Sequence, residues 1–181
     1  MDIYKIKWTR LQNEIFRFLC IKVGKMFNQR GIAKNLNVSP TAIGKAVVSL
    51  EKDNLIKVEK NETINLTLIE LNRDNYKAVE LKRVENLKMI YESDFDDFLE
   101  EKFPGSIIIL FGSYSYGEDT INSDIDIAIV GCKEKKINLE EFEKLLEREI
   151  RINYYESFDK ITKHLRSNLF NGIVLSGRID L

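Results

Sequence analysis

The stretch "FGSYSYGEDTINSDIDIAIV", residues 111–130, decides the fold of the C-terminal part of the chain. It follows the apolar run "IIIL" and ends in the run "IDIAIV", and both runs suit strands that are buried on both faces. Two carboxylates nevertheless belong to this part of the chain, with Asp124 directly before the second run and Asp126 within it. A buried carboxylate is costly unless it is protonated, ion-paired or bound to a metal, so the surrounding chain must supply one of these.

The spacing of these residues predicts a shared site. Side chains two apart on a strand leave the same face, so Asp124 and Asp126 point to one spot while the isoleucines between and after them point away. Two such carboxylates suit Mg2+, which binds carboxylates together with substrate phosphates. Gly112 and Ser113 join the first strand to an expected helix, where backbone N–H groups can hold a phosphate.

The pattern Gly-Ser, ten residues, Asp-x-Asp resembles the DNA polymerase β nucleotidyltransferase superfamily, and the whole stretch is similar to its minimal nucleotidyltransferases. The resemblance covers about residues 86–181 and implies an α/β (α+β) domain with a mixed sheet. The positions that match the family pattern are Gly112, Ser113, Gly117, Ser123, Asp124 and Asp126.

The resemblance also implies a reaction and a partner. A nucleoside triphosphate, expected to be ATP, would give its nucleoside monophosphate to an acceptor hydroxyl and lose pyrophosphate. Asp124 and Asp126 would be the catalytic and Mg2+-binding residues, and Gly112, Ser113 and Ser123 would bind the nucleotide. Minimal nucleotidyltransferases frequently act as antitoxins that modify a tyrosine of a helical HEPN-type toxin, so such a toxin is the expected protein partner.

Two positions depart from the family pattern. The family usually has a third carboxylate on a following strand, and in the expected strand "EIRINYYES", residues 149–157, the matching position is Asn153. Glu149 shares its strand face but lies four residues away, and Glu156 has the opposite parity. The family also often has Arg where this chain has Tyr116. Both departures favour a rival interpretation, in which the domain senses a nucleotide as part of a transcriptional regulator and is catalytically impaired.

The N-terminal part predicts three helices followed by a hairpin. Apolar residues recur at helical spacing from Trp8 to about Val23, and again in "QRGIAKNLN", residues 29–37. A third helix is expected after Ser39, a good N-cap, with Pro40 in its first position. Next, "LIKVEK" and "TINLTLIEL" alternate apolar and polar residues around a polar turn, which is typical of a two-stranded hairpin.

This order of elements, over about residues 8–71, resembles the winged helix-turn-helix regulators of archaea and bacteria. The resemblance implies that the third helix enters the major groove of DNA while the wing approaches the backbone. The residues expected to face DNA are Ser39, Thr41 and Lys45 on the helix and Lys57 and Lys60 near the wing. Winged helices also serve as protein-interaction modules, and this alternative stays open.

Charge divides the chain in a way that fits two domains. Residues 1–75 hold 13 Lys or Arg against 8 Asp or Glu, a balance of +5, whereas residues 76–181 have a balance of −6. The first part can therefore approach a polyanion. We place the winged helix-turn-helix domain in residues 1–75 and a helical linker with the minimal nucleotidyltransferase domain in residues 76–181. The third helix is not rich in Arg, so DNA affinity is expected to need a homodimer.

The remaining segments predict helices. Residues 73–103 have apolar side chains at helical intervals, with a break expected near Ser93. The stretch 131–150 reads as a polar loop that runs into an amphipathic helix. The side chains expected to face inward from that helix are Phe142, Leu145, Leu146 and Ile150. The last segment, from Phe158, predicts a helix and a short extended tail.

Composition argues against several other classes of protein. The chain has 181 residues, 44% of them hydrophobic and 31% charged, which suits one compact domain or two small ones. Its two cysteines are far apart and its single histidine has no cysteine neighbour, so a zinc finger is not expected. No apolar segment is long enough for a membrane span, and the first residues lack a signal-peptide pattern, so we expect a cytoplasmic protein without a membrane partner.

Three functions remain as candidates at this point. The first is Mg2+-dependent nucleotidyl transfer by a protein that also binds DNA. The second is the regulator that senses a nucleotide without transferring it. Transfer to a small molecule such as an aminoglycoside is a third candidate, and it gives the winged helix no evident role.

Overall fold

The computed structural model of the protein describes residues 7–61 and 66–179. These residues form two compact units that divide between Lys82 and Arg83, within one helix, α4 (Tyr76–Glu92). The predicted turn between the two wing strands lies partly in residues 62–65 and so outside the described residues. None of the helices in the described ranges combines the length and apolar character that crossing a membrane requires.

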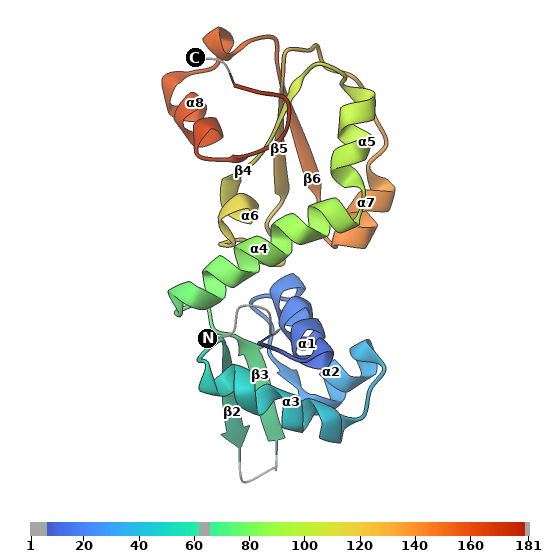
Figure 1. The fold of residues 1–181 in the computed structure, drawn as a ribbon, viewed down its shortest axis with the longest axis vertical. Helices are drawn as coiled ribbons and strands as arrows, with labels where there is room; N and C mark the ends of the chain where they lie inside the picture. The colour runs from blue at the N-terminus through green and yellow to red at the C-terminus, as the bar shows by residue number, and fades with distance from the viewer. Residues whose placement is uncertain (1–6, 62–65, 180–181) are drawn as a thin grey trace. The chain divides into compact units, whose positions relative to one another are not determined.

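The N-terminal unit has the winged-helix order (Figure 1). Its elements are α1 (Arg10–Ile21), β1 (Phe27–Asn28), α2 (Gln29–Leu36), α3 (Pro40–Lys52), β2 (Ile56–Asn61) and β3 (Leu66–Leu71). The strands form an antiparallel sheet in the order β1-β3-β2. The three helices and the hairpin are thus confirmed, and the two-residue strand β1 is an addition that the sequence pattern did not indicate.

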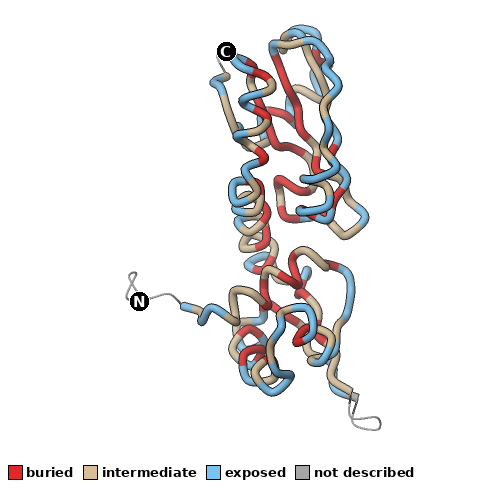
Figure 2. Tube along the Cα trace, turned by 90° about the vertical axis from the view of Figure 1, so that its right-hand side faces the viewer, coloured by how far each residue is buried: buried red, intermediate tan, exposed pale blue. Residues whose placement is uncertain are grey.

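Local chemistry explains where these helices begin and end. The side chain of Ser39 accepts a hydrogen bond from the N–H of Ala42, and Pro40 occupies the first turn of α3, as predicted. Asn37 ends α2 in the left-handed conformation, with φ of 53°. The predicted inward stripe of α3 is buried and packs with α1 and β3 in one apolar core, which Figure 2 shows as buried segments.

The C-terminal unit contains the rest of α4 and a four-stranded mixed sheet. Its further elements are α5 (Phe95–Lys102), β4 (Ile107–Phe111), α6 (Gly112–Tyr116), β5 (Ile125–Val130), α7 (Glu140–Leu146), β6 (Ile150–Tyr155), the 3-10 helix η1 (Phe158–Lys160), α8 (Lys163–Phe170) and β7 (Ile173–Ser176). The strand order is β6-β5-β4-β7, in which only β5 and β6 are parallel. The expected break near Ser93 is confirmed between α4 and α5, where Asp94 has φ of 56°.

The two faces of this sheet carry separate cores. Ile125, Ile127 and Ile129 of β5 pack with α5 and α7 on one face. Ala128 and Val130 pack on the other face with residues of α8. Figure 1 shows α5 and α7 on one side of the strands and α8 on the other. By strand alternation, Asp126 belongs to the face that α8 covers.

The helix predicted before β6 is shorter than expected. It ends at Leu146, because Glu147 takes the left-handed conformation with φ of 53° and the chain turns toward β6. The prediction that Leu145 faces inward is wrong, because its side chain is 61% exposed. Ile150 is buried, but it belongs to strand β6 and not to the helix in which it was expected. Leu146 is buried and Phe142 packs against the same core, as predicted.

Candidate active site

The turn from β4 into α6 brings a carboxylate against a glycine. Gly112 has φ of +72°, a conformation that side chains with a Cβ rarely adopt. A Cβ built on Gly112 would lie 2.5 Å from Oδ2 of Asp126, which is paired across the sheet with Phe111. The Gly-Ser turn and the second aspartate are therefore neighbours, and the space beside the carboxylate exists only because residue 112 has no side chain.

The two aspartates form a like-charge pair that is partly removed from water. Asp124 directly precedes β5 and Asp126 lies within it, and both are half-buried. Burial raises the pKa of Asp126 above its usual range, the charge of Asp124 raises it further, and Arg151 opposes both effects. A divalent cation bound to both carboxylates would relieve this repulsion, so the residues present fit a Mg2+ ion.

Arg151 of β6 is the cation that the structure places beside this pair. In the parallel register of β5 and β6, Arg151 lies opposite Asp126, and its Nη1 is 2.9 Å from Oδ2 of Asp124. Its Nε is 3.8 Å from Oε1 of Glu149. Asn153, predicted at the position of the third carboxylate, lies opposite Ala128, two residue pairs further along the strands. The side chain next to the aspartates on β6 is therefore positively charged.

The predicted nucleotide-binding serines have different surroundings. The Oγ of Ser123 accepts a hydrogen bond from the N–H of Thr120 at 2.9 Å, and its own N–H donates to the Thr120 carbonyl at 3.0 Å. Ser123 thus closes the turn that delivers Asp124 to β5. Ser113 is half-buried in α6, and its carbonyl accepts from the N–H of Glu118 at 3.0 Å. Gly117 ends α6 in the left-handed conformation, with φ of 74°.

A buried polar network holds the loop between α6 and β5. Asp119, which is 0% exposed, accepts a hydrogen bond from Nδ2 of Asn86 at 2.7 Å and pairs with Nη2 of Arg148 at 3.2 Å. The same Asn86 nitrogen also donates to the carbonyl of Tyr114 in α6, at 2.9 Å. The network therefore ties α4, α6 and the start of β6 to the loop that carries the aspartate pair.

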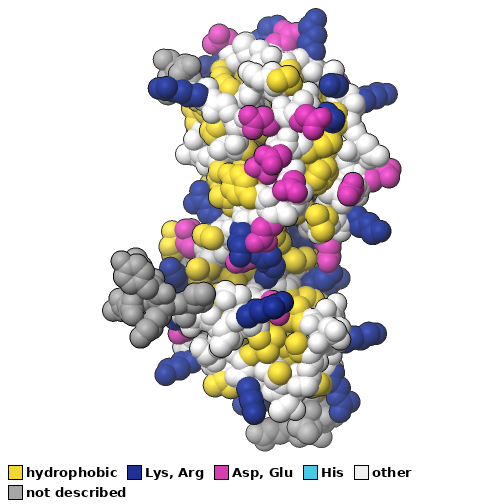
Figure 3. Space-filling model, turned by 45° about the vertical axis from the view of Figure 1, so that its right-hand side comes forward, with side chains coloured by type: hydrophobic (Ala, Val, Ile, Leu, Met, Phe, Trp, Pro, Cys, Tyr) yellow, Lys and Arg dark blue, Asp and Glu magenta, His cyan; other side chains and the backbone are white. Residues whose placement is uncertain are grey.

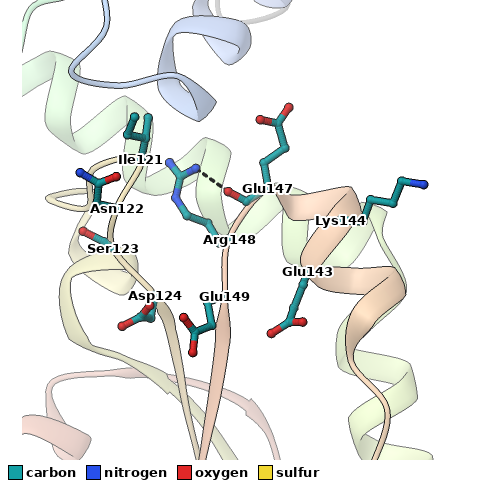
Figure 4. Close-up of a pocket in the computed structure, with 9 residues that line it drawn as sticks. All are labelled: Ile121, Asn122, Ser123, Asp124, Glu143, Lys144, Glu147, Arg148 and Glu149. Carbon is teal, nitrogen blue, oxygen red and sulfur yellow. Dashed lines mark hydrogen bonds between the residues drawn. The ribbon is translucent and has the colours of Figure 1, made fainter.

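A hollow of about 500 Å³ opens beside Asp124, between the α6–β5 loop and the end of α7. Four of its lining side chains are acidic, namely Asp124, Glu143, Glu147 and Glu149. Figure 4 shows Asp124, Glu143 and Glu149 pointing to the same side while Lys144 points away. Of the predicted site residues only Ser123 and Asp124 line it, and its acidic lining disfavours a triphosphate.

The residues predicted to face DNA lie on two elements of the N-terminal unit. Ser39, Thr41 and Lys45 are exposed at the beginning of α3, although the Ser39 hydroxyl already caps that helix. Lys57 is paired with Asp74, with 2.6 Å between Nζ and Oδ2, whereas Lys60 is exposed. Strand alternation puts Lys57 and Lys60 on opposite faces of β2, so both cannot face the same surface.

Comparison with known proteins identifies the C-terminal part. Residues 92–175 match the family model described as "Nucleotidyltransferase domain". This part of the chain is a nucleotidyltransferase domain. The match contains the Gly112 turn, both aspartates and Arg151, and it agrees with the mixed sheet. The comparison with curated protein sequences found no match for the chain.

Among solved structures the chain is similar to regulators. It is 24% identical to the adhesin competence repressor AdcR from Streptococcus pyogenes, with a TM-score of 0.41, over 54% of this chain and 69% of that one. It is 25% identical to a mutant of ZitR from Lactococcus lactis, with a TM-score of 0.42, over 57% of this chain and 65% of that one. ZitR is described as a zinc-responsive MarR family member. The scores are low, so the winged-helix assignment depends on the element order of the N-terminal unit itself.

Tyr116 of the nucleotidyltransferase domain also has a cationic neighbour. The guanidinium carbon of Arg83, in α4, lies 5.9 Å from the centre of the Tyr116 ring. The family often has Arg at the position of Tyr116, and here an arginine from another element lies over the residue that replaces it. Such a contact contributes about 0.5–1 kcal/mol at an exposed site.

The contact between residue 112 and Asp126 can be tested by comparing two glycines. Gly112→Ala and Gly105→Ala both force a left-handed alanine, since φ is +72° and +78°, but a Cβ on Gly105 meets nothing within 4 Å. We expect Gly112→Ala to cost about 1–3 kcal/mol more in free energy of unfolding than Gly105→Ala, because only its methyl group overlaps another group. Urea unfolding followed by far-UV circular dichroism measures both values. Equal costs, or an excess that persists when Asp126 is also replaced by Ala, would contradict the contact.

Proposed function

We propose that the nucleotidyltransferase domain moves a nucleoside monophosphate from a nucleoside triphosphate, expected to be ATP, to an acceptor hydroxyl. The observation that carries this proposal is the placement of the Asp126 carboxylate against the Gly112 turn, with the charge of Asp124 close to it just before β5. Asp124 and Asp126 would hold Mg2+. When bound, this ion would stabilise negative charge on the attacking and leaving oxygens.

The chain's own groups would orient the reactants. The backbone N–H groups of the turn suit phosphate oxygens, since Gly112 has no side chain of its own to cover them and the Asp126 carboxylate that would share a cation with the phosphate lies against it. The acceptor oxygen would form a bond to the α-phosphorus while the bond from that phosphorus to the bridging oxygen of pyrophosphate breaks, and the hydroxyl proton would pass to solvent. The acidic hollow beside Asp124 favours an acceptor with a neutral or basic surface on that side.

The direct test is transfer of label from α-labelled ATP to an acceptor by the full chain in the presence of Mg2+. The first acceptor to try is a helical HEPN-type toxin encoded beside the protein, because the resemblance to minimal nucleotidyltransferases implies a tyrosine hydroxyl. Covalent label that appears with Mg2+ and disappears with a chelator supports the proposal. Saturable, Mg2+-dependent binding of ATP without transfer to any acceptor would contradict it and would support the nucleotide-sensing regulator.

We also propose that the winged helix binds DNA, with the protein acting in the cytoplasm on its own operator. The supporting observation is the exposed beginning of α3, where Thr41 and Lys45 project from the helix that follows the turn. The positive balance of the N-terminal part contrasts with the C-terminal unit, on which Figure 3 shows Asp and Glu side chains gathered. DNA would therefore approach the N-terminal unit.

A pair of lysines tests this DNA interface. Lys45→Ala is expected to weaken binding to a fragment of the protein's own promoter by about tenfold, because a phosphate contact would be lost. Lys57→Ala serves as the matched comparison and is expected to have a smaller effect, since Lys57 is already paired with Asp74. Fluorescence anisotropy at several salt concentrations measures both. Equal affinities of Lys45→Ala and the unmodified protein would exclude this face of α3 from the interface.

A further inference from the structure

We infer that Arg151 takes the place of a metal-ligating side chain, so that the site binds one divalent cation with a nucleoside triphosphate and the guanidinium supplies the other positive charge. This inference rests on the proposed function of the nucleotidyltransferase domain. It makes Arg151 a positioning residue for the triphosphate and predicts that two bound ions are excluded.

Arg151 already contacts one of the two aspartates that would bind a metal ion. Arg151 lies opposite Asp126 in the register of β5 and β6, and its Nη1 is 2.9 Å from an oxygen of Asp124. The guanidinium therefore engages one of the two carboxylates that a cation would need. Within residues 7–61 and 66–179, no three side chains of His, Cys, Asp or Glu gather closely enough to hold a metal ion. Asp124 and Asp126 alone offer few ligands, so a second metal ion would need further ligands of its own.

The net charge of the site favours one bound cation over two. Asp124, Asp126 and Arg151 together carry −1, and one divalent cation changes this to +1, which suits a polyanionic triphosphate. A second divalent cation would bring the sum to +3 beside a guanidinium that already occupies Asp124. In two-metal sites the ions lie about 3.5–4 Å apart, so the repulsion between the second ion and Arg151 would be strong.

The Arg151 side chain is exposed enough to contact a bound triphosphate. The Arg151 side chain is 58% exposed, whereas that of Asp124 is 22% exposed. The far side of the guanidinium is thus open to solvent, where the planar fork of N–H groups can donate to phosphate oxygens. Glu149, at 3.8 Å from Nε, holds the guanidinium from the rim of the site. One arginine can in this way link Asp124 to a bound triphosphate.

The test counts ions in the full chain. Mn2+ is titrated with the α,β-methylene triphosphates of adenosine, guanosine, cytidine and uridine in parallel, and free Mn2+ is measured by electron paramagnetic resonance against protein-free blanks. We expect one Mn2+ per unmodified chain and two per Arg151→Asp chain. That substitution changes the charge by −2, which offsets the +2 of one further divalent cation, and adds a carboxylate opposite Asp126. Arg151→Lys, which keeps the charge, should bind one ion.

The outcomes separate the inference from the proposed function. Two ions on the unmodified chain, or one ion on an Arg151→Asp chain that melts cooperatively, would overturn the inference and leave the proposed function standing. No ion on the unmodified chain with any of the four triphosphates would overturn both. Arg151→Ala guards against a folding defect in the aspartate variant. Measured with Mn2+ alone, it should bind one ion several-fold more tightly than the unmodified chain, because Asp124 loses its competing cation, and unchanged or weaker binding would count against the inference.

Discussion

Asp126→Asn is expected to lower the rate of nucleotidyl transfer at least about 100-fold. The asparagine keeps the shape of the side chain beside Gly112 but removes the charge that would hold the metal ion. The same substitution should not destabilise the fold. Burial and the charge of Asp124 raise the pKa of Asp126, which means that the ionised carboxylate is less favourable in the folded protein than in the unfolded chain. A neutral amide removes that unfavourable term, so stability and activity should change independently.

The measurement pairs single-turnover label transfer with urea unfolding of the same preparations. Asp159→Asn is the control, because Asp159 is an exposed acid of the same domain and has no place in the proposed site. We expect it to change neither quantity. Transfer by Asp126→Asn at the rate of the unmodified protein would remove Asp126 from the reaction. A large loss of stability in that variant would instead show that the ionised carboxylate contributes to folding.

Arg148→Met is expected to lower the free energy of unfolding of the C-terminal unit by about 3–5 kcal/mol. The reason is that Asp119, at 0% exposure, would keep its charge and lose its ionic partner, with only the amide of Asn86 left among the donors described above. Methionine is close to arginine in length and apolar bulk, so the effect should come from charge and not from a cavity. We therefore expect the stability of the loop that carries the aspartates to depend strongly on the ion pair of Asp119 and Arg148.

Two further variants make the experiment specific. Lys88→Met breaks the exposed pair of Lys88 and Glu92 and should cost no more than about 0.5 kcal/mol. The double variant Asp119→Leu with Arg148→Met should recover much of the loss, since both buried charges are gone. Far-UV circular dichroism is the suitable probe, because the only tryptophan, Trp8, belongs to the N-terminal unit. A cost below 1 kcal/mol for Arg148→Met would contradict the role of this ion pair.

Much of the fold could be predicted because its signals are local. The serine and proline that begin α3 act within one turn of helix, and the apolar runs that become β4 and β5 need no partner to be recognised. The spacing from the Gly-Ser turn to the aspartates also lies within one stretch of chain. The structure brings Gly112 and Asp126 together as the spacing implied.

The features of the fold and of the site that the sequence did not predict depend on contacts between residues far apart in the chain. The sequence pattern predicts Asn153 beside the aspartates. The strand register, however, fixes which residue of β6 lies opposite Asp126, and this residue is Arg151. The sequence also predicts too long a helix before β6, since nothing in its local pattern shows that Arg148 pairs with the buried Asp119. The pairing of β7 with β4 was also unpredicted, because a short extended tail does not say which strand it joins.

The pairing of β7 with β4 has a practical consequence for protein production. β4 is an almost entirely apolar strand, and β7 supplies hydrogen-bonding partners along one of its sides. A shortened form that stops before Ile173 would leave that row of backbone groups open, and an open apolar strand recruits strands from other molecules. We therefore expect the four residues of β7 to limit aggregation, and deletions meant to trim the C-terminal tail should spare them.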